Sequence, residues 1–187
     1  MNLYFRLIRV LICAFSSIRG QSASIDFPNG VSKLTFRAWP FDCDLNFHMN
    51  QARYSNLTDL ARFDMIIRMG LGSLVKQRKL SPIVLGINME YKKEIRPFEA
   101  FTIESRAFSW EKNITGIEHL FFVQRHGEKV LAAKGLAKVS LYDRKQRAFA
   151  QPEEYAAHLG QPTPEVIMSA TEADFMKLRL INKEPNS

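Results

Sequence analysis

A change of hydrophobic period near the middle of the chain constrains the fold more than any other feature. Over residues 50–69, apolar residues recur at steps of three and four, which indicates a helix with Asn50 as its N-cap and Gly70 as its stop. Alternating segments with short polar connections then follow at 83–95, 101–112, 117–125 and 129–143. Another alternating segment, 34–41, precedes the helix. This order predicts an α+β fold, an antiparallel sheet packed against one long helix.

The helix and strands belong to one domain, with further segments before and after it. The chain has 187 residues, 46% of them hydrophobic, which suits one domain of ordinary size. We place that domain at 33–160, after a linker rich in small residues and turn formers at 21–32. Short helices are predicted at 152–160 and 163–182, the second within a C-terminal extension at 161–187.

Residues 1–20 are apolar and basic, and three interpretations of them stay open. At helical spacing, their polar residues form one stripe, composed of Asn2, Arg6, Arg9, Cys13 and Ser16. The first interpretation is a helix lying in a membrane interface, with its arginines directed at lipid headgroups. The second is a helix packed on its own domain or on a partner. The third is a cleaved signal peptide, although the unbroken apolar run at 10–15 is short.

The formal charge of +7 favours an anionic partner, such as a membrane surface or a phosphate-bearing substrate. The basic residues are scattered and no nucleic-acid-binding motif is present, so we expect no nucleic-acid partner. Only Cys13 and Cys43 are cysteines, which predicts no disulfide framework and a reducing compartment. The expected location is therefore cytoplasmic, peripheral at a membrane through residues 1–20.

Residues 41–50 place a polar side chain at every second position, directly before the long helix. On an extended backbone, Asp42, Asp44, Asn46 and His48 would share one face. The apolar residues between them would hold the loop to the core. A carboxylate beside an imidazole and the free amides of a helix start is suited to acyl transfer.

Two other roles for these polar residues remain open from local chemistry alone. They can form a simple capping loop, because Asp and Asn are common before helices. Asp42, Asp44 and His48 can also bind a metal ion, although no second ligand cluster stands out and we expect no metal. Cys43 is disfavoured as a nucleophile, because the flanking acids oppose a thiolate.

Residues 44–50, Asp-Leu-Asn-Phe-His-Met-Asn, followed by Ala-Arg-Tyr at 52–54, resemble the signature of hotdog-fold acyl thioesterases. The motif is most similar to those of the 4-hydroxybenzoyl-CoA thioesterase-like group and of plant acyl-ACP thioesterases, and the whole chain resembles the branch of thioesterase superfamily member 6. The resemblance covers roughly residues 34–159. Gln51 departs from the pattern, since the family often has a second Asn there.

The resemblance implies an antiparallel sheet wrapped around a long central helix, and cleavage of acyl-CoA or acyl-ACP thioesters without a cofactor. Asp44 matches the nucleophile or general base, and Asn46 and His48 match the residues that assist it. Met49, Asn50 and Tyr54 match substrate-binding positions, and backbone amides at 48–50 would polarise the thioester carbonyl.

A single hotdog unit further implies a homodimer or a dimer of dimers. Asp42 matches a common first acid of a D-x-D pair and is expected to be structural. An apolar tunnel beside the helix would hold the acyl chain. The alternative function is a non-catalytic, membrane-associated hotdog protein that binds acyl-CoA or lipid.

Overall fold

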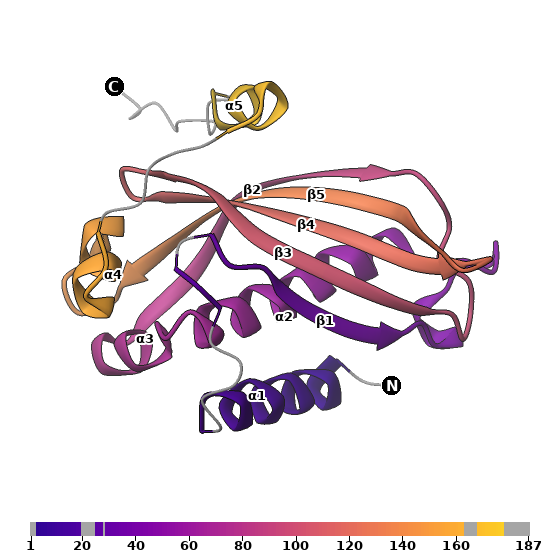
Figure 1. The fold of residues 1–187 in the computed structure, drawn as a ribbon, viewed down its shortest axis with the longest axis horizontal. Helices are drawn as coiled ribbons and strands as arrows, with labels where there is room; N and C mark the ends of the chain where they lie inside the picture. The colour runs from indigo at the N-terminus through magenta and orange to yellow at the C-terminus, as the bar shows by residue number, and fades with distance from the viewer. Residues whose placement is uncertain (1–2, 20–24, 28, 163–167, 178–187) are drawn as a thin grey trace, which may run out of the picture.

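In the computed structural model, which describes residues 3–19, 25–27, 29–162 and 168–177, a curled sheet wraps around one long helix (Figure 1). The elements are α1 (Leu3–Arg19), β1 (Ser32–Arg37), the 3₁₀ turn η1 (Pro40–Asp42), α2 (Gln51–Arg68), α3 (Gly72–Arg78), β2 (Leu80–Tyr91), β3 (Ala100–Glu111), β4 (Ile114–Arg125), β5 (Glu128–Asp143), β6 (Ala148–Phe149), α4 (Pro152–Leu159) and α5 (Ala170–Lys177).

All strand pairs in the sheet are antiparallel. The strand order is β1-β3-β4-β5-β2, with β6 paired to β5, so β1 and β2 are the two edges of the path. Helix α2 lies inside the curve of the sheet (Figure 1). The predicted α+β arrangement of an antiparallel sheet around a central helix is confirmed.

The predicted helix at 50–69 and the four long strands are present, with shifted boundaries. Two of the shifted boundaries have a clear structural cause. The strand predicted at 34–41 ends at Arg37, because Pro40 begins the turn η1. Strand β2 starts at Leu80 and runs through Pro82, which an edge strand tolerates because one side of it needs no donor. Helix α3 and strand β6 were not predicted.

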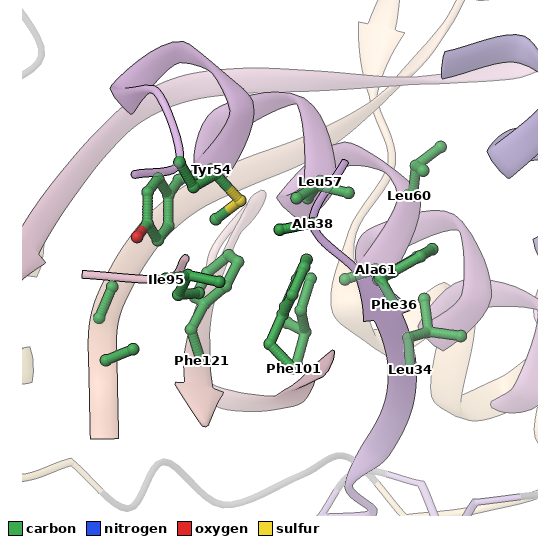
Figure 2. Close-up of a cluster of buried hydrophobic side chains, with 14 of the residues drawn as sticks. Leu34, Phe36, Ala38, Tyr54, Leu57, Leu60, Ala61, Ile95, Phe101 and Phe121 are labelled. Carbon is green, nitrogen blue, oxygen red and sulfur yellow. The ribbon is translucent and has the colours of Figure 1, made fainter. Parts of the chain in front are cut away.

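The core forms where α2 faces the concave side of the sheet (Figure 2). Aromatic side chains stack through it: the Tyr54 ring lies 5.0 Å from the Phe121 ring, and Phe101 lies 6.3 Å from Phe121. Leu57 and Ile95 fill the space around them. Each fully buried side chain of this size contributes roughly 1.5–3 kcal/mol, so this cluster fixes the start of α2 against the sheet.

A buried polar pair lies further along α2, between β3 and β4. Nδ1 of His119 is 2.8 Å from Oγ of Ser105, and Nε2 is 3.5 Å from Nη1 of Arg62. A guanidinium only donates, so Nε2 accepts and the Nδ1–H donates to Ser105. Burial, and secondarily the charge of Arg62, lowers the pKa of His119 to about 3. Arg62 itself pairs with Asp59.

Helix α1 packs on its own domain, along α2 and beside β1 (Figure 1). Val10 enters the core cluster, and Arg6 is buried. The expectation that the polar stripe of residues 1–20 faces lipid headgroups is therefore wrong for Arg6, whose guanidinium faces the protein. Asn2 and residue 20 lie outside the described residues. No helix in the described part of the chain is long and apolar enough to cross a membrane.

Helix α5 lies on the opposite, convex face of the sheet (Figure 1). Phe175 packs against Phe108 and Leu136, and the buried Glu172 accepts a 2.6 Å hydrogen bond from Arg106. Helix α5 forms the middle of the helix predicted at 163–182. Residues 163–167 and 178–182 of that prediction lie outside the described residues. The proposed division of the chain at residues 20, 32 and 160 stays a prediction.

The neutral state of His119 predicts a pH-dependent stability. The pKa of His119 is about 3 in the folded protein, against an ordinary 6.5 when unfolded. Only the unfolded state then takes up this proton as the pH falls below 6.5, so acid weakens the fold. As the pH falls from 7 to 5, the free energy of unfolding should therefore decrease by about 2 kcal/mol because of His119. The side chain in His119→Gln cannot titrate, so urea denaturation of this variant should not show this decrease. An equal pH dependence of the free energy of unfolding in the two proteins would contradict a neutral, buried His119.

Candidate active site

The loop between η1 and α2 is a closed turn. The Asn50 N–H donates to the Asp42 carbonyl at 2.8 Å, and the Asp44 N–H donates to the His48 carbonyl at 3.0 Å. Cys43 and Met49 form a β-bridge between these bonds. At the tip, Phe47 adopts a left-handed backbone conformation with φ 57°. The loop thus leaves the domain and returns to it within a few residues.

This geometry corrects the extended backbone that the alternating pattern predicted. Asp42, Asp44, Asn46 and His48 do not share one face. Asp44 and His48 come together across the turn instead, while Asp42 points into the protein. The apolar residues were also wrongly assigned in part. Met49 is buried, but Leu45 is 96% exposed and Phe47 is 77% exposed, so these two do not hold the loop to the core.

The Asp44 carboxylate is held by the turn and remains partly exposed. One oxygen, Oδ1, accepts the Asn46 N–H at 2.9 Å. The other, Oδ2, lies 3.7 Å from Nδ1 of His48. One carboxylate oxygen is therefore fixed by the backbone, and the second faces the imidazole.

Asn50 caps α2 as predicted, because its side-chain oxygen accepts the Ala52 N–H at 2.9 Å. The amides expected to polarise a substrate are differently placed. The Met49 N–H donates to the Ile95 carbonyl, and the Asn50 N–H is used by Asp42. The Gln51 N–H, at the first position of α2, donates to no acceptor in the part of the chain that the structure describes. Gln51 is thus the residue whose amide can meet a negative oxygen at the helix start.

A groove of about 400 Å³ opens beside this loop, a volume typical of ligand sites. Four of the predicted residues line it: Asp44, His48, Met49 and Tyr54. Asn50 lines an adjoining groove between α2 and β2, and Asn46 lines a third groove that also includes His48. The six predicted site residues therefore surround one region at the N-terminal end of α2.

The strand end that forms the opposite wall was not predicted as part of the site. Tyr91, Lys92, Lys93 and Glu94 line the groove together with Gln51. The alternation at 83–95 placed Tyr91 on a strand face, but nothing in it showed that this face lies opposite the polar loop. The Tyr91 ring lies 5.0 Å from the Tyr54 ring. Burial, and then Tyr91, raises the pKa of Tyr54, so this phenol stays protonated and is not a base.

Neither Asp42 nor Cys43 is suited to react with a ligand in the groove. Asp42 is buried against arginine side chains. Burial, followed by the charges of Asp42 and Asp44, raises the pKa of the Cys43 thiol, so little thiolate exists at neutral pH. Among the described residues, no group of three His, Cys, Asp or Glu side chains is placed to hold a metal ion.

The site thus combines the Asp44 carboxylate, the His48 imidazole beside it, and the Gln51 N–H at the start of α2. The carboxylate can attack an electrophilic carbon or take a proton from water. The amide, supported by the helix dipole, can stabilise an oxyanion. The arrangement is suited to acyl transfer or hydrolysis at a carbonyl group.

Comparison with protein-family models gives a match over residues 38–170 to the family described as thioesterase-like superfamily. Among curated proteins, the chain is similar to Protein THEM6 of Xenopus laevis, with 33% identity over 82 residues. That alignment covers 44% of this chain and 40% of the relative, so the chain matches less than half the length of this relative.

Solved structures confirm the hotdog fold. A probable thioesterase from Escherichia coli, YbaW, superposes with a TM-score of 0.61 at 19% identity, over 71% of this chain and 98% of that one. The 4-hydroxybenzoyl-CoA thioesterase of Pseudomonas sp. strain CBS-3 superposes with a TM-score of 0.60 at 18% identity, over 69% and 98%. In each case nearly the whole neighbour is matched, whereas parts of this chain lie beyond the shared fold.

Proposed function

Because this chain belongs to the thioesterase-like superfamily, we propose that it is a thioester hydrolase that cleaves acyl-CoA at the loop around Asp44. The observation that carries this proposal is the position of Asp44. Its carboxylate lies at the edge of a groove, beside His48 and near the Gln51 N–H.

Asp44 acts on the thioester carbonyl in one of two ways. As a nucleophile, it adds to the carbonyl carbon and expels the thiolate, and water then hydrolyses the resulting anhydride. As a general base, it removes a proton from water, which attacks the same carbon. Both routes consume one water and release a free acid and a thiol. His48 and Asn46 orient the carboxylate and the water, and the Gln51 N–H receives the charge that develops on the carbonyl oxygen.

Coenzyme A is the carrier we propose, because the groove offers cationic side chains to its phosphates. Lys92 and Lys93 line the groove together with the acidic Asp44 and Glu94, and Arg96, which pairs with Glu94, lies in the adjoining groove. Cationic side chains at this position suit the phosphates of coenzyme A. The solved neighbour from Pseudomonas is likewise named as a CoA thioesterase. Acyl-ACP is the alternative carrier and belongs in the same assay.

The acyl group would lie in the open groove between α2 and β2, over Ser55, Ile87 and Met89. The tunnel expected beside the helix is not supported here, because Leu57 and Phe121 fill that space with core side chains. Asn50 lines this groove, whereas Met49 and Tyr54 line the first groove, where the thioester would lie. The bound chain therefore has one side open to solvent or to a second subunit.

A homodimer formed at β2 would cover this open side. Strand β2 pairs with β5 along one edge, and within the described residues nothing pairs with its other edge. Val84, Ile87 and Tyr91 on this strand are exposed. A long, partly apolar edge strand favours pairing with another chain, and the groove is lined from the same strand.

Charges on the edge of β2 should therefore dissociate the dimer. In analytical ultracentrifugation, we expect the wild-type protein at twice the 21.5 kDa of one chain, or at four times for a dimer of dimers. Val84→Lys with Ile87→Lys should shift it to the monomer and lower its activity. Val31→Lys, at an exposed apolar residue before β1, is the matched control and should keep the dimer. A monomeric wild-type protein would refute this interface.

We also propose that the protein associates peripherally with membranes through the outer face of α1, which exposes Tyr4, Phe5, Ile8 and Ile12. An exposed apolar helix face can lie in the headgroup region of a bilayer. Ile8→Ser with Ile12→Ser changes only this outer face. We expect the wild-type protein to sediment with anionic phospholipid vesicles and the double variant to remain in the supernatant. Equal sedimentation of both proteins would exclude α1 as the contact.

Asp44→Asn should abolish most of the thioesterase activity while leaving the loop intact, because the Asn oxygen still accepts the Asn46 N–H. Across a panel of short, long and aromatic acyl-CoAs and acyl-ACP, followed by thiol release, kcat should fall at least about a hundredfold. Asp174→Asn, the same change on the exposed surface of α5, is the control.

An Asp44→Asn enzyme with full activity would refute the assigned mechanism. A wild-type protein that binds acyl-CoA but releases no thiol from any substrate would refute the hydrolase. The non-catalytic acyl-CoA-binding or lipid-binding protein would then be the better description.

A further inference from the structure

Arg6 of helix α1 is buried against the base of the candidate active-site loop. Its guanidinium is 2% exposed and forms a two-pronged ion pair with Asp42, at 2.5 Å from Nη2 to Oδ2 and 3.3 Å from Nη1 to Oδ1. Nη2 also donates to the Arg37 carbonyl at the end of β1, at 3.0 Å. One side chain from α1 thus joins the last residue of β1 to the acid two positions before Asp44.

Asp42 is the residue from which the loop departs and to which it returns. Its backbone carbonyl accepts the Asn50 N–H at 2.8 Å, and its carboxylate accepts the Trp39 N–H at 2.9 Å. Arg53 of α2 approaches the same carboxylate at 3.7 Å and donates to the Phe41 carbonyl at 3.1 Å. Asp42 therefore determines where the loop sits relative to the start of α2.

We propose that Arg6 is a positioning residue for Asp44, and that α1 is part of the catalytic apparatus through the Arg6–Asp42 pair. This inference rests on the proposed function, because it assigns Arg6 a part in the same reaction. Arg6 is not among the residues that line the groove. It holds the buried carboxylate of Asp42 in place, and Asp42 in turn holds the loop that presents Asp44 to the groove.

A buried carboxylate without its partner is strongly unfavourable, so loss of Arg6 should displace the loop. Arg53 cannot replace Arg6, because its side chain is half exposed and its Nε lies 3.7 Å from Asp42. Asp42 would then turn toward solvent. This movement disturbs the bonds from Trp39 and Asn50, and displacements of about 1 Å in a catalytic group are costly to turnover.

Arg9 provides an internal control for this role. Like Arg6, it lies on α1, stacks over the Phe36 ring and donates to a β1 carbonyl, that of Thr35 at 2.7 Å. Unlike Arg6, it has no contact with the loop among its described interactions. Arg9→Met thus removes an α1–β1 contact of the same kind without affecting Asp42.

The experiment compares Arg6→Met, Asp42→Asn, the double variant and Arg9→Met by steady-state kinetics on an acyl-CoA that the wild-type enzyme hydrolyses. Arg6→Met should lower kcat about tenfold or more with KM within about twofold, because the groove is untouched. Arg9→Met should stay within about twofold of the wild type. The double variant buries no unpaired charge and should recover to within about threefold of the wild-type kcat.

Equal losses in Arg6→Met and Arg9→Met would show that docking of α1 as a whole is what matters, and would overturn the proposal. A wild-type kcat in folded Arg6→Met would overturn it as well. So would a double variant no better than the worse single variant.

Hydrogen exchange separates this proposal from the thioesterase proposal. The amides of residues 41–50 should exchange faster in Arg6→Met than in the wild type. In Arg9→Met, their exchange rates should equal those of the wild type. If the wild-type protein hydrolyses no thioester, the proposed function fails, while faster exchange in Arg6→Met alone still supports Arg6 as the residue that holds the loop. Equal protection of this loop in all variants would refute it.

Discussion

Burial of the Asp42 carboxylate is the constraint around which the site is arranged. A carboxylate that is 2% exposed needs charged and hydrogen-bonding partners close by, and Arg6, Arg53 and the Trp39 N–H supply them. These partners come from α1, from α2 and from the turn after β1. The two acids of the loop therefore have different environments: Asp42 is enclosed and structural, whereas Asp44 remains accessible in the groove.

The fold was predictable wherever a local pattern determines the structure. The stripe at 50–69 identified α2, its cap at Asn50 held, and the alternation identified the four long strands. The errors lie where tertiary context decides. The start of β2 was not predicted because of Pro82. A proline is acceptable in this strand only because β2 lies at the edge of the sheet. Helix α3 is short, and its residues show no clear apolar stripe.

The site was predictable in composition but not in geometry. Asp44 and His48 do meet, yet across a turn that the Asp44 side chain helps to form by accepting the Asn46 N–H. The alternating pattern gave no sign of this turn. Nor could it show that Asp42 pairs with a residue 36 positions earlier, or that Lys93 and Tyr91 face the loop, because both depend on long-range packing.

The proposed catalysis depends on where the carbonyl group of the substrate binds. A crystal structure with an acyl-CoA analogue, in which a methylene replaces the thioester sulfur, tests it directly. We expect the carbonyl oxygen at about 2.7–3.1 Å from the Gln51 nitrogen, with the carbonyl carbon facing the Asp44 carboxylate. A carbonyl group bound away from both residues, or in a groove that Asp44 does not line, would contradict it.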